Sequence, residues 1–293
     1  MTPVPDASVI VRARDEARNL ERLLPLLAEQ GGDLTVELVL VDGGSRDGTA
    51  ALARAHGARV LHLPAAEFTF GGALNLGAAN AGAAVLVALS AHAFPVQPEW
   101  LARLVEQFDD ARVACACGDS YGPDGEPLAS AIEQDIALAR RRPEWGYSNA
   151  AGAFRAELWR RRPFRTDLPG CEDKEWAWHW LARGYVCVVA PGLAVDHDHT
   201  HDSLRSIYGR ARREAIGYAA FAGPAPTGPR ALAREWWSDL RWYHSPLQAR
   251  LSHRRAARLL GAYAGRREAS MSNAALRDDV RDRPQDDLDV GPQ

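Results

Sequence analysis

Two neighbouring carboxylates are the side chains of this sequence best suited to moving a proton. The segment EDKEWAWHW puts Glu172 and Asp173 in the first turn of an expected helix, where the positive end of the helix dipole stabilises anions. An ionised carboxylate that faces a cleft is a candidate general base. On this segment alone, an ordinary acidic first turn is the simpler interpretation.

A second group of polar residues follows two expected strands near the N-terminus. In VDGGSRDGT, Asp42 ends an apolar strand, Gly43 allows a tight turn and Asp47 is expected to cap the next helix, whose free N–H groups favour an anion. Upstream, Asp15 and Glu16 follow the first strand. A carboxylate beside Asp42 suits the hydroxyls of a ribose or the N–H of a base. A simple strand–helix turn and helix capping by Asp15 are the alternatives.

Histidines form a third group. In DHDHTHD, His197, His199 and His201 are two residues apart, so on an extended segment they project from one face. Imidazole and carboxylate both bind metal ions, but such a run is also typical of a solvated loop. We expect one of these histidines to be functional. Another, His92, follows Ser90 in LSAHAFP, at the end of an apolar run.

Strand-like and helix-like segments alternate from residue 8 to residue 118. Short apolar runs predict the strands, and amphipathic runs predict the helices. This alternation is typical of an α/β fold with a mostly parallel sheet flanked by helices. Such a sheet binds ligands at the carboxyl ends of its strands. Those ends carry residues from each polar group: Arg12 to Glu16, Asp42 to Ser45, and Ser90 to His92.

The C-terminal part differs in composition from the rest of the chain. We expect an α/β domain over residues 1–222, a helical extension over 223–266 and a disordered tail over 267–293, which is acidic and poor in large apolar residues. Residues 230–266 predict a basic, Trp-rich helical pair. Such helices either lie on an anionic membrane or pack on the α/β domain or on another subunit, and we favour packing.

The overall composition excludes some classes of protein. The chain is 46% apolar and 25% charged, with a net charge of -3, which is ordinary for a globular protein and gives no indication of nucleic-acid binding. No apolar run approaches the roughly 20 residues of a transmembrane helix, and no signal-peptide pattern opens the sequence. We expect a cytoplasmic protein with reduced cysteines, peripheral to the inner membrane face if its basic helices bind lipid.

Taken in order, these segments resemble the family-2 glycosyltransferases of the GT-A fold, from about residue 7 to residue 222. VIVRARDEARNL resembles the opening strand and Asn-Glu turn of the family, with Asp15 in place of the Asn. VDGGSRDGT resembles its Asp-Asp-Gly-Ser turn. PGCEDKEWAWHWLARGYVCVVAPGLAVDHDH resembles the acid pair, its helix, a Gly-Tyr strand and a late His. Within this family the chain resembles rhamnosyltransferase-like enzymes of bacterial surface polysaccharides.

The resemblance implies an inverting enzyme that moves a hexose-type sugar from a nucleotide-diphosphate donor to a hydroxyl of a surface polysaccharide, glycolipid or small glycoside. It implies that Asp173 is the general base and that Glu172 positions the acceptor or donor. Asn149, in SNAAGAF, would contact the acceptor or cap a turn, and Trp176 would offer a platform for a sugar or lie in the core. The residues implied for the nucleotide and diphosphate are Arg12, Glu16, Asp42, Gly43, Ser90 and His92.

One motif departs from the family. Ser90-Ala91-His92 stands where the family carries Asp-x-Asp, whose last Asp binds Mg²⁺ or Mn²⁺. Mg²⁺ prefers oxygen ligands, whereas Mn²⁺ accepts imidazole, so the candidate metal ligands are His92 with His197 or His199. Alternatively, His92 as a cation binds the diphosphate without a metal. The remaining alternative is a catalytically inactive GT-A-fold protein that binds nucleotide sugars or assembles with a partner, although the intact acid pair favours activity.

Overall fold

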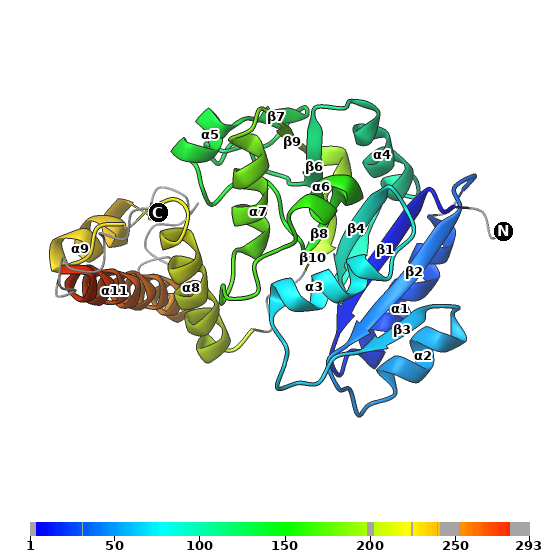
Figure 1. The fold of residues 1–293 in the computed structure, drawn as a ribbon, viewed down its shortest axis with the longest axis horizontal. Helices are drawn as coiled ribbons and strands as arrows, with labels where there is room; N and C mark the ends of the chain where they lie inside the picture. Colours follow the sequence, from blue (N-terminus) through cyan, green and yellow to red (C-terminus); the bar gives the residue numbers. More distant parts are fainter. Residues whose placement is uncertain are drawn as a thin grey trace, which may run out of the picture. The chain divides into compact units, whose positions relative to one another are not determined.

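The chain forms two compact units, Met1–His201 and Asp202–Gln293. In Figure 1 the first unit contains the sheet and its helices, and the second consists of helices. Each unit is described by itself. The computed structural model describes residues 4–30, 32–197, 202–223, 225–238, 240 and 252–281.

An eight-stranded sheet forms the centre of the first unit, with the order β3-β2-β1-β4-β8-β6-β9-β7. The first four strands in this order run parallel to one another, as do β6 and β9. Strand β8 is antiparallel to both β4 and β6, and β7 is antiparallel to β9. This confirms the mostly parallel sheet. The strands are β1 (Ala7–Ala13), β2 (Val36–Asp42), β3 (Arg59–His62), β4 (Val85–Ser90), β6 (Val113–Gly118), β7 (Ile132–Gln134), β8 (Ala151–Arg155) and β9 (Val186–Ala190).

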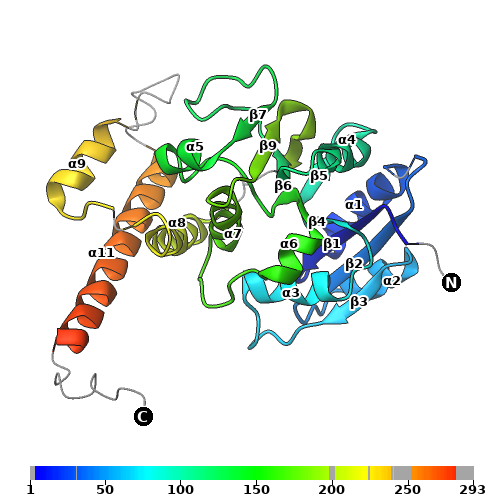
Figure 2. The same ribbon diagram turned by 45° about the horizontal axis from the view of Figure 1, so that its top comes forward.

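Helices cover both faces of this sheet. Figure 2 shows α1 and α4 on one side and α3 and α6 on the other. The helices of the first unit are α1 (Ala17–Glu29), α2 (Thr49–Ala55), α3 (Phe70–Ala79), α4 (Trp100–Glu106), α5 (Ile136–Arg141), α6 (Ala156–Arg161) and α7 (Glu172–Leu181), with the 3-10 turns η1 (Gln107–Asp109) and η2 (Pro191–Leu193).

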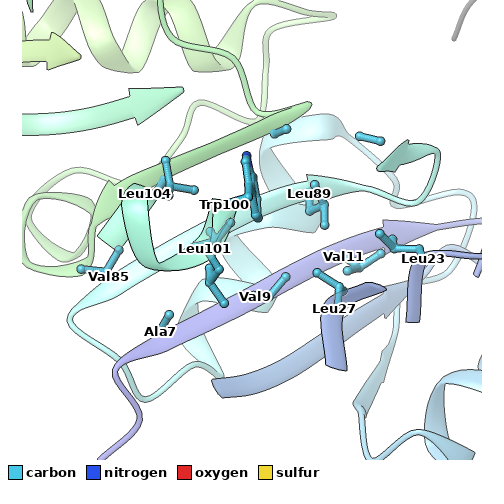
Figure 3. Close-up of a cluster of buried hydrophobic side chains, with 14 of the residues drawn as sticks. Ala7, Val9, Val11, Leu23, Leu27, Val85, Leu89, Trp100, Leu101 and Leu104 are labelled. Carbon is cyan, nitrogen blue, oxygen red and sulfur yellow. The ribbon is translucent and has the colours of Figure 1, made fainter. Parts of the chain in front are cut away.

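Alternation along the strands divides the core into two clusters. Successive side chains of β1 point to opposite faces, so Val9 and Val11 join one cluster while Ile10 joins the other. The first cluster includes the buried leucines of α1 and Trp100 of α4 (Figure 3). The second includes Leu74 of α3 and aromatic residues from β8 and α7. Because both faces of the sheet are buried, the central strands are largely apolar.

A separate two-stranded sheet joins two distant polar segments. Strand β5 (Ala93–Pro95) pairs antiparallel with β10 (Val195–His197), and Ala93 lies opposite His197. The chain just after Ser90 is thereby brought beside the start of the histidine run. The pairing brings together two motifs that lie about a hundred residues apart in the sequence.

The second unit contains α8 (Leu204–Ala219), α9 (Pro229–Ser238) and α11 (His253–Arg281). Helices α8 and α11 pack closely because two glycines of α11 face the α8 backbone. A Cβ added at Gly261 would lie 2.3 Å from the carbonyl oxygen of Tyr208, and one at Gly265 would lie 2.2 Å from that of Arg212. Only a residue without a Cβ permits this approach.

The second unit differs from the expected domain boundaries at both ends. Helix α8 belongs to the unit that begins at Asp202 because it packs on α11, whereas we expected it within an α/β domain ending at residue 222. Helix α11 continues to Arg281, past the residue 267 where we expected a disordered tail to begin. Ala, Leu and Arg, which recur in this segment, have high helix propensity. Within the described part of the chain, no helix is both long and apolar enough to cross a membrane.

Candidate active site

Neighbouring strands bring the separate N-terminal motifs together at one edge of the sheet. In the pairing of β1 with β4, Arg12 lies opposite Ser90, and in the pairing of β1 with β2, Ala13 lies opposite Asp42. Parallel strands present their carboxyl ends at the same edge, where ligands bind in such sheets. The residues that follow β1, β2 and β4 therefore surround a common region, as the sequence predicts.

The turns after β1 and β2 hold each other through side-chain hydrogen bonds. The Asp15 carboxylate accepts a hydrogen bond from the N–H of Arg46 at 2.7 Å, so Asp15 does not cap α1. The Asp47 carboxylate accepts from the N–H of Ala17, at the start of α1, and from that of Thr49, at the start of α2. Asp47 thus bonds the first residue of both helices. These hydrogen bonds fix the two turns to each other next to the strand ends.

Asp42 is a buried carboxylate at the end of β2. It is 5% exposed, accepts a hydrogen bond from the N–H of Ser45 at 3.1 Å and lies 3.6 Å from Nδ1 of His62. The N–H of Gly43 donates to the carbonyl of Ala13, which fixes the turn against β1. Asp42 is therefore oriented by its neighbours before any ligand arrives.

The imidazole of His92 is the centre of a polar cluster beside this edge. Its Nδ1 lies 3.4 Å from Glu16 Oε1, and its ring nitrogens lie 3.3 and 3.4 Å from Ser90 Oγ. The ring also stacks on His197, with 4.9 Å between ring centroids. Burial raises the pKa of Glu16, but hydrogen bonds from His92 and Asn19 outweigh it and leave that pKa below its ordinary value. The cluster therefore holds an ionised carboxylate against an imidazole.

The acid pair lies in the first turn of α7, as the sequence predicts. The Asp173 carboxylate accepts hydrogen bonds from the N–H of Asn149 at 3.0 Å and from that of Lys174 at 2.7 Å. Glu172 is only 5% exposed, and its Oε1 lies 3.7 Å from Nη1 of Arg12. Cys171, just before the helix, has a φ of +63°, a left-handed conformation that is uncommon for a residue with a Cβ.

The two carboxyl groups of the pair differ in their environment. Burial, together with the adjacent charge of Asp173, raises the pKa of Glu172 to about 7, although the charge of Arg12 opposes the shift. Glu172 therefore binds a proton more readily than an ordinary carboxyl group does. A carboxyl group whose environment differs from that of its neighbour can take a separate acid–base role.

A comparison with known families identifies the chain. The model of a family described as "Glycosyl transferase family 2" matches residues 8–168, more than half of the sequence. The chain belongs to this family. The matched range contains the turns after β1 and β2 and the Ser90–His92 segment, and it ends just before the acid pair. No curated protein matches the chain significantly.

Solved glycosyltransferase structures share the fold of this chain. A mannosyltransferase from Pyrobaculum calidifontis, in complex with GDP-Man and Mn²⁺, has a TM-score of 0.61 and 21% identity over 94% of this chain and 81% of its own. Glucosyl-3-phosphoglycerate synthase from Mycobacterium tuberculosis, in complex with phosphoglyceric acid, has a TM-score of 0.56 and 21% identity over 76% and 82%. S. aureus TarS, residues 1–349, has a TM-score of 0.53 and 14% identity over 91% of each chain.

From the sequence we expected Arg12 to contact the nucleotide. In this glycosyltransferase its side chain has other partners. Its guanidinium donates to the carbonyl of Asn149 at 3.1 Å and faces Glu172, and its side chain is 14% exposed. Arg12 therefore links β1 to the acid pair. An Arg inside a buried strand requires a buried partner, so the sequence indicated that Arg12 has one. The sequence did not indicate which residue, because the partner Glu172 is 160 residues away.

The two predicted acceptor residues are both turned inward. Trp176 is fully buried, and its indole N–H donates to the carbonyl of Arg162 at 2.7 Å. Phe164 and Trp180 pack against it, so Trp176 belongs to the core and offers no surface platform. Asn149 is 2% exposed, and its side-chain amide lies 3.4 Å from Glu172. Asn149 thus holds the acid pair in place through both its backbone and its side chain.

The predicted metal ligands are only partly brought together. His92 and His197 stack, whereas His199 lies outside the described residues. Among the described side chains, no group of three or more His, Cys, Asp or Glu is arranged to hold a metal ion. The donors around His92 are the Glu16 carboxylate, the Ser90 hydroxyl and a second imidazole. This set alone does not complete a metal site.

An open cleft of about 350 Å³ lies next to the segments that hold the acid pair, although neither Glu172 nor Asp173 lines it. Its wall includes residues on either side of Asn149 and the Lys174 that follows Asp173. The ammonium group of Lys174 donates to the carbonyl of Gly146 at 2.9 Å. The segment SNAAGAF, expected at the acceptor, supplies Ser148 and its neighbours to this wall, but the rest of the wall comes from three other stretches of the chain that local patterns did not connect. The polar residues of the wall are Asp119, Ser120, Glu144, Ser148, Lys174 and His197.

Proposed function

We propose that this glycosyltransferase transfers a hexose-type sugar, with inversion, from a nucleoside diphosphate to an acceptor hydroxyl, with Asp173 as general base. The observation that carries the proposal is the position of Asp173: its carboxylate is fixed by two backbone N–H groups, and the next residue, Lys174, lies in the wall of the open cleft. A base must lie within hydrogen-bond reach of the proton that it removes. The proposal therefore requires an acceptor in the cleft to extend past Lys174 to the Asp173 carboxylate.

The reaction that follows is a single displacement. Asp173 takes the proton of the acceptor hydroxyl while the hydroxyl oxygen forms its bond to the anomeric carbon. The bond from that carbon to the diphosphate breaks, and the nucleoside diphosphate leaves with the electron pair. The raised pKa of Glu172 disfavours a second negative charge beside Asp173, and Arg12 and Asn149 hold the pair in position.

The donor is proposed to bind at the strand ends. Asp42 and Glu16 suit ribose or base contacts, the backbone at Gly43 allows close approach, and Ser90 and His92 face the diphosphate. The mannosyltransferase that shares the fold binds GDP-Man with Mn²⁺, and TarS binds UDP-GlcNAc. Mn²⁺ suits the imidazole donors near Ser90 better than Mg²⁺ does.

Calorimetric titration tests the donor site. The protein would be titrated with UDP, TDP, GDP and CDP, each with Mn²⁺ and with EDTA. Binding of one nucleotide only with Mn²⁺ would support a metal held at the histidine cluster. Equal binding in EDTA would support direct contact between His92 and the diphosphate. Failure of all four nucleotides to bind would refute the proposed donor class.

A catalytically inactive nucleotide-sugar-binding protein is the second candidate. The observation that favours it is that Ser90 and His92 stand where the family carries the carboxylates of Asp-x-Asp. The Asp173→Asn variant separates the two. A catalyst should lose its nucleoside diphosphate release by roughly 100-fold or more while it still binds donor. Asp167→Asn, an exposed carboxylate six residues earlier in the chain, is the matched control and should keep normal turnover. Undiminished turnover in Asp173→Asn would exclude this residue as the base.

The acceptor is proposed to be a surface polysaccharide, a glycolipid or a small glycoside. The cleft wall offers hydroxyl, carboxylate, ammonium and imidazole groups to sugar hydroxyls. Such an acceptor would assign the protein to polysaccharide biosynthesis for the cell envelope, on the cytoplasmic side. Transfer assays with lipid-linked and free saccharides would test this, and transfer only to a non-saccharide hydroxyl would contradict it.

A further inference from the structure

The charge of this chain is distributed very unevenly. Residues 202–271 contain thirteen Arg and five Asp or Glu, a net charge of +8, whereas the whole chain carries -3. The rest of the chain therefore carries a net charge of -11. A segment with this excess of Arg attracts an anionic partner.

Helix α9, in this basic segment, has two distinct faces. Its inner face packs on α11: Glu235 pairs with Arg266, and the guanidinium of Arg255 lies 4.8 Å from the centre of the Trp236 ring. The acidic residue of the helix is thereby turned inward. Every charge that remains on the other face is positive.

The outer face of α9 consists of Arg230, Ala233, Arg234 and Trp237. These residues are spaced i, i+3, i+4 and i+7 and are all exposed, Trp237 to 60%. Such spacing aligns them on one side of a helix. A large indole beside two guanidinium groups is an amphipathic surface, apolar at the ring and cationic around it.

We propose that this outer face of α9 docks the protein on an anionic lipid bilayer. Arg side chains next to a membrane are attracted by its negative surface potential, and Trp rings prefer the level of the headgroups. A ten-residue amphipathic helix lies in the interface and does not span it. The exposed Leu260 and Met271 on α11 add apolar surface to the same unit.

The combination of groups favours lipid over nucleic acid. Both partners would attract the Arg residues, but exposed aliphatic side chains such as Leu260 gain little from a phosphate backbone. Burial of such side chains in a bilayer is favourable because it removes apolar surface from water. This inference concerns the second unit alone and does not depend on the chemistry of the first.

Vesicle sedimentation with the full chain tests the proposal. The protein should sediment with phosphatidylcholine vesicles that contain about 30% phosphatidylglycerol, and not with pure phosphatidylcholine, at about 0.1 M salt. Binding should weaken at about 0.5 M salt because the surface potential is screened. The double variant Arg230→Gln/Arg234→Gln should lower the partition coefficient about 30-fold, and Trp237→Ala should lower it about tenfold.

A matched control separates this face from overall charge. Arg160→Gln/Arg161→Gln removes two exposed Arg residues from α6 and should leave binding unchanged. Equal losses in the two double variants would overturn the proposal, as would equal binding to neutral vesicles or no binding at all. Tighter binding to a single-stranded RNA than to the anionic vesicles would also overturn it. So would a change from dimer to monomer in Trp237→Ala with vesicle binding intact, since the face would then join two copies.

Discussion

The substitution Glu172→Gln should remove a pH dependence of stability that comes from one buried carboxyl group. In the folded protein the pKa of Glu172 is raised to about 7 from an ordinary value of 4.5, first by burial and then by the charge of Asp173. The folded state therefore holds this proton more tightly than the unfolded state does. The stability that Glu172 contributes is fully present below the unfolded pKa and is lost as the pH rises through the folded pKa.

The expected magnitude follows from these two values. At about 1.4 kcal/mol for each pH unit, the interval from 4.5 to about 7 corresponds to about 3 kcal/mol. The free energy of unfolding of the wild type should fall by this amount, relative to Glu172→Gln, between about pH 5 and pH 8. Gln cannot ionise and is nearly isosteric, so its amide can keep the contact with Asn149.

Urea denaturation of both proteins across this range, followed by tryptophan fluorescence, would measure the difference. Groups that titrate equally in the two proteins cancel in that difference. Glu157→Gln, an exposed carboxylate on α6, is the control and should follow the wild type at every pH. A difference between wild type and Glu172→Gln that stays constant from about pH 5 to pH 8 would refute the raised pKa and the proton assignment built on it.

Three further substitutions test how the structure holds the site and the second unit. Arg12→Met removes the hydrogen bond to the Asn149 carbonyl and the charge beside Glu172, so it should destabilise the fold by roughly 1–3 kcal/mol and slow turnover, whereas Arg54→Met, at an exposed Arg in the last turn of α2, should do neither; unfolding and rate measurements on both check this. Trp176→Ala should cost about 3–5 kcal/mol in chemical denaturation, and a loss of acceptor affinity without loss of stability would contradict its core position. Gly261→Ala should destabilise the α8–α11 pair by roughly 1–3 kcal/mol despite the better helix propensity of Ala, and a rise in the melting temperature would show that the two backbones can separate without cost.

Local patterns were sufficient for most of the fold. The central strands are buried on both faces and so are largely apolar, which made β1, β2 and β4 recognisable without tertiary information. The same patterns located Asp42 at a strand end and the acid pair in a first helical turn. The sheet edge where these groups meet follows from parallel topology.

Side-chain partners far apart in the sequence were beyond local patterns. Trp176 lies in a helix whose pattern does not distinguish a core ring from a surface platform, and only the packing of Phe164 and Trp180 decides between them. Asp15 and Asp47 follow different strands, so their bonds to the neighbouring turn depend on how the strands pair.

The sequence by itself determined the α/β class, the family motifs and the positions of the carboxylates, because strand and helix periodicity and first-turn acids are properties of neighbouring residues. The tertiary structure alone decided the role of Arg12, the inward orientation of Asn149 and the cleft beside Asp173. It also decided that α8 joins α11. These features depend on burial and on charges brought together by the sheet and by helix packing, and neither is encoded in the spacing of residues along one segment.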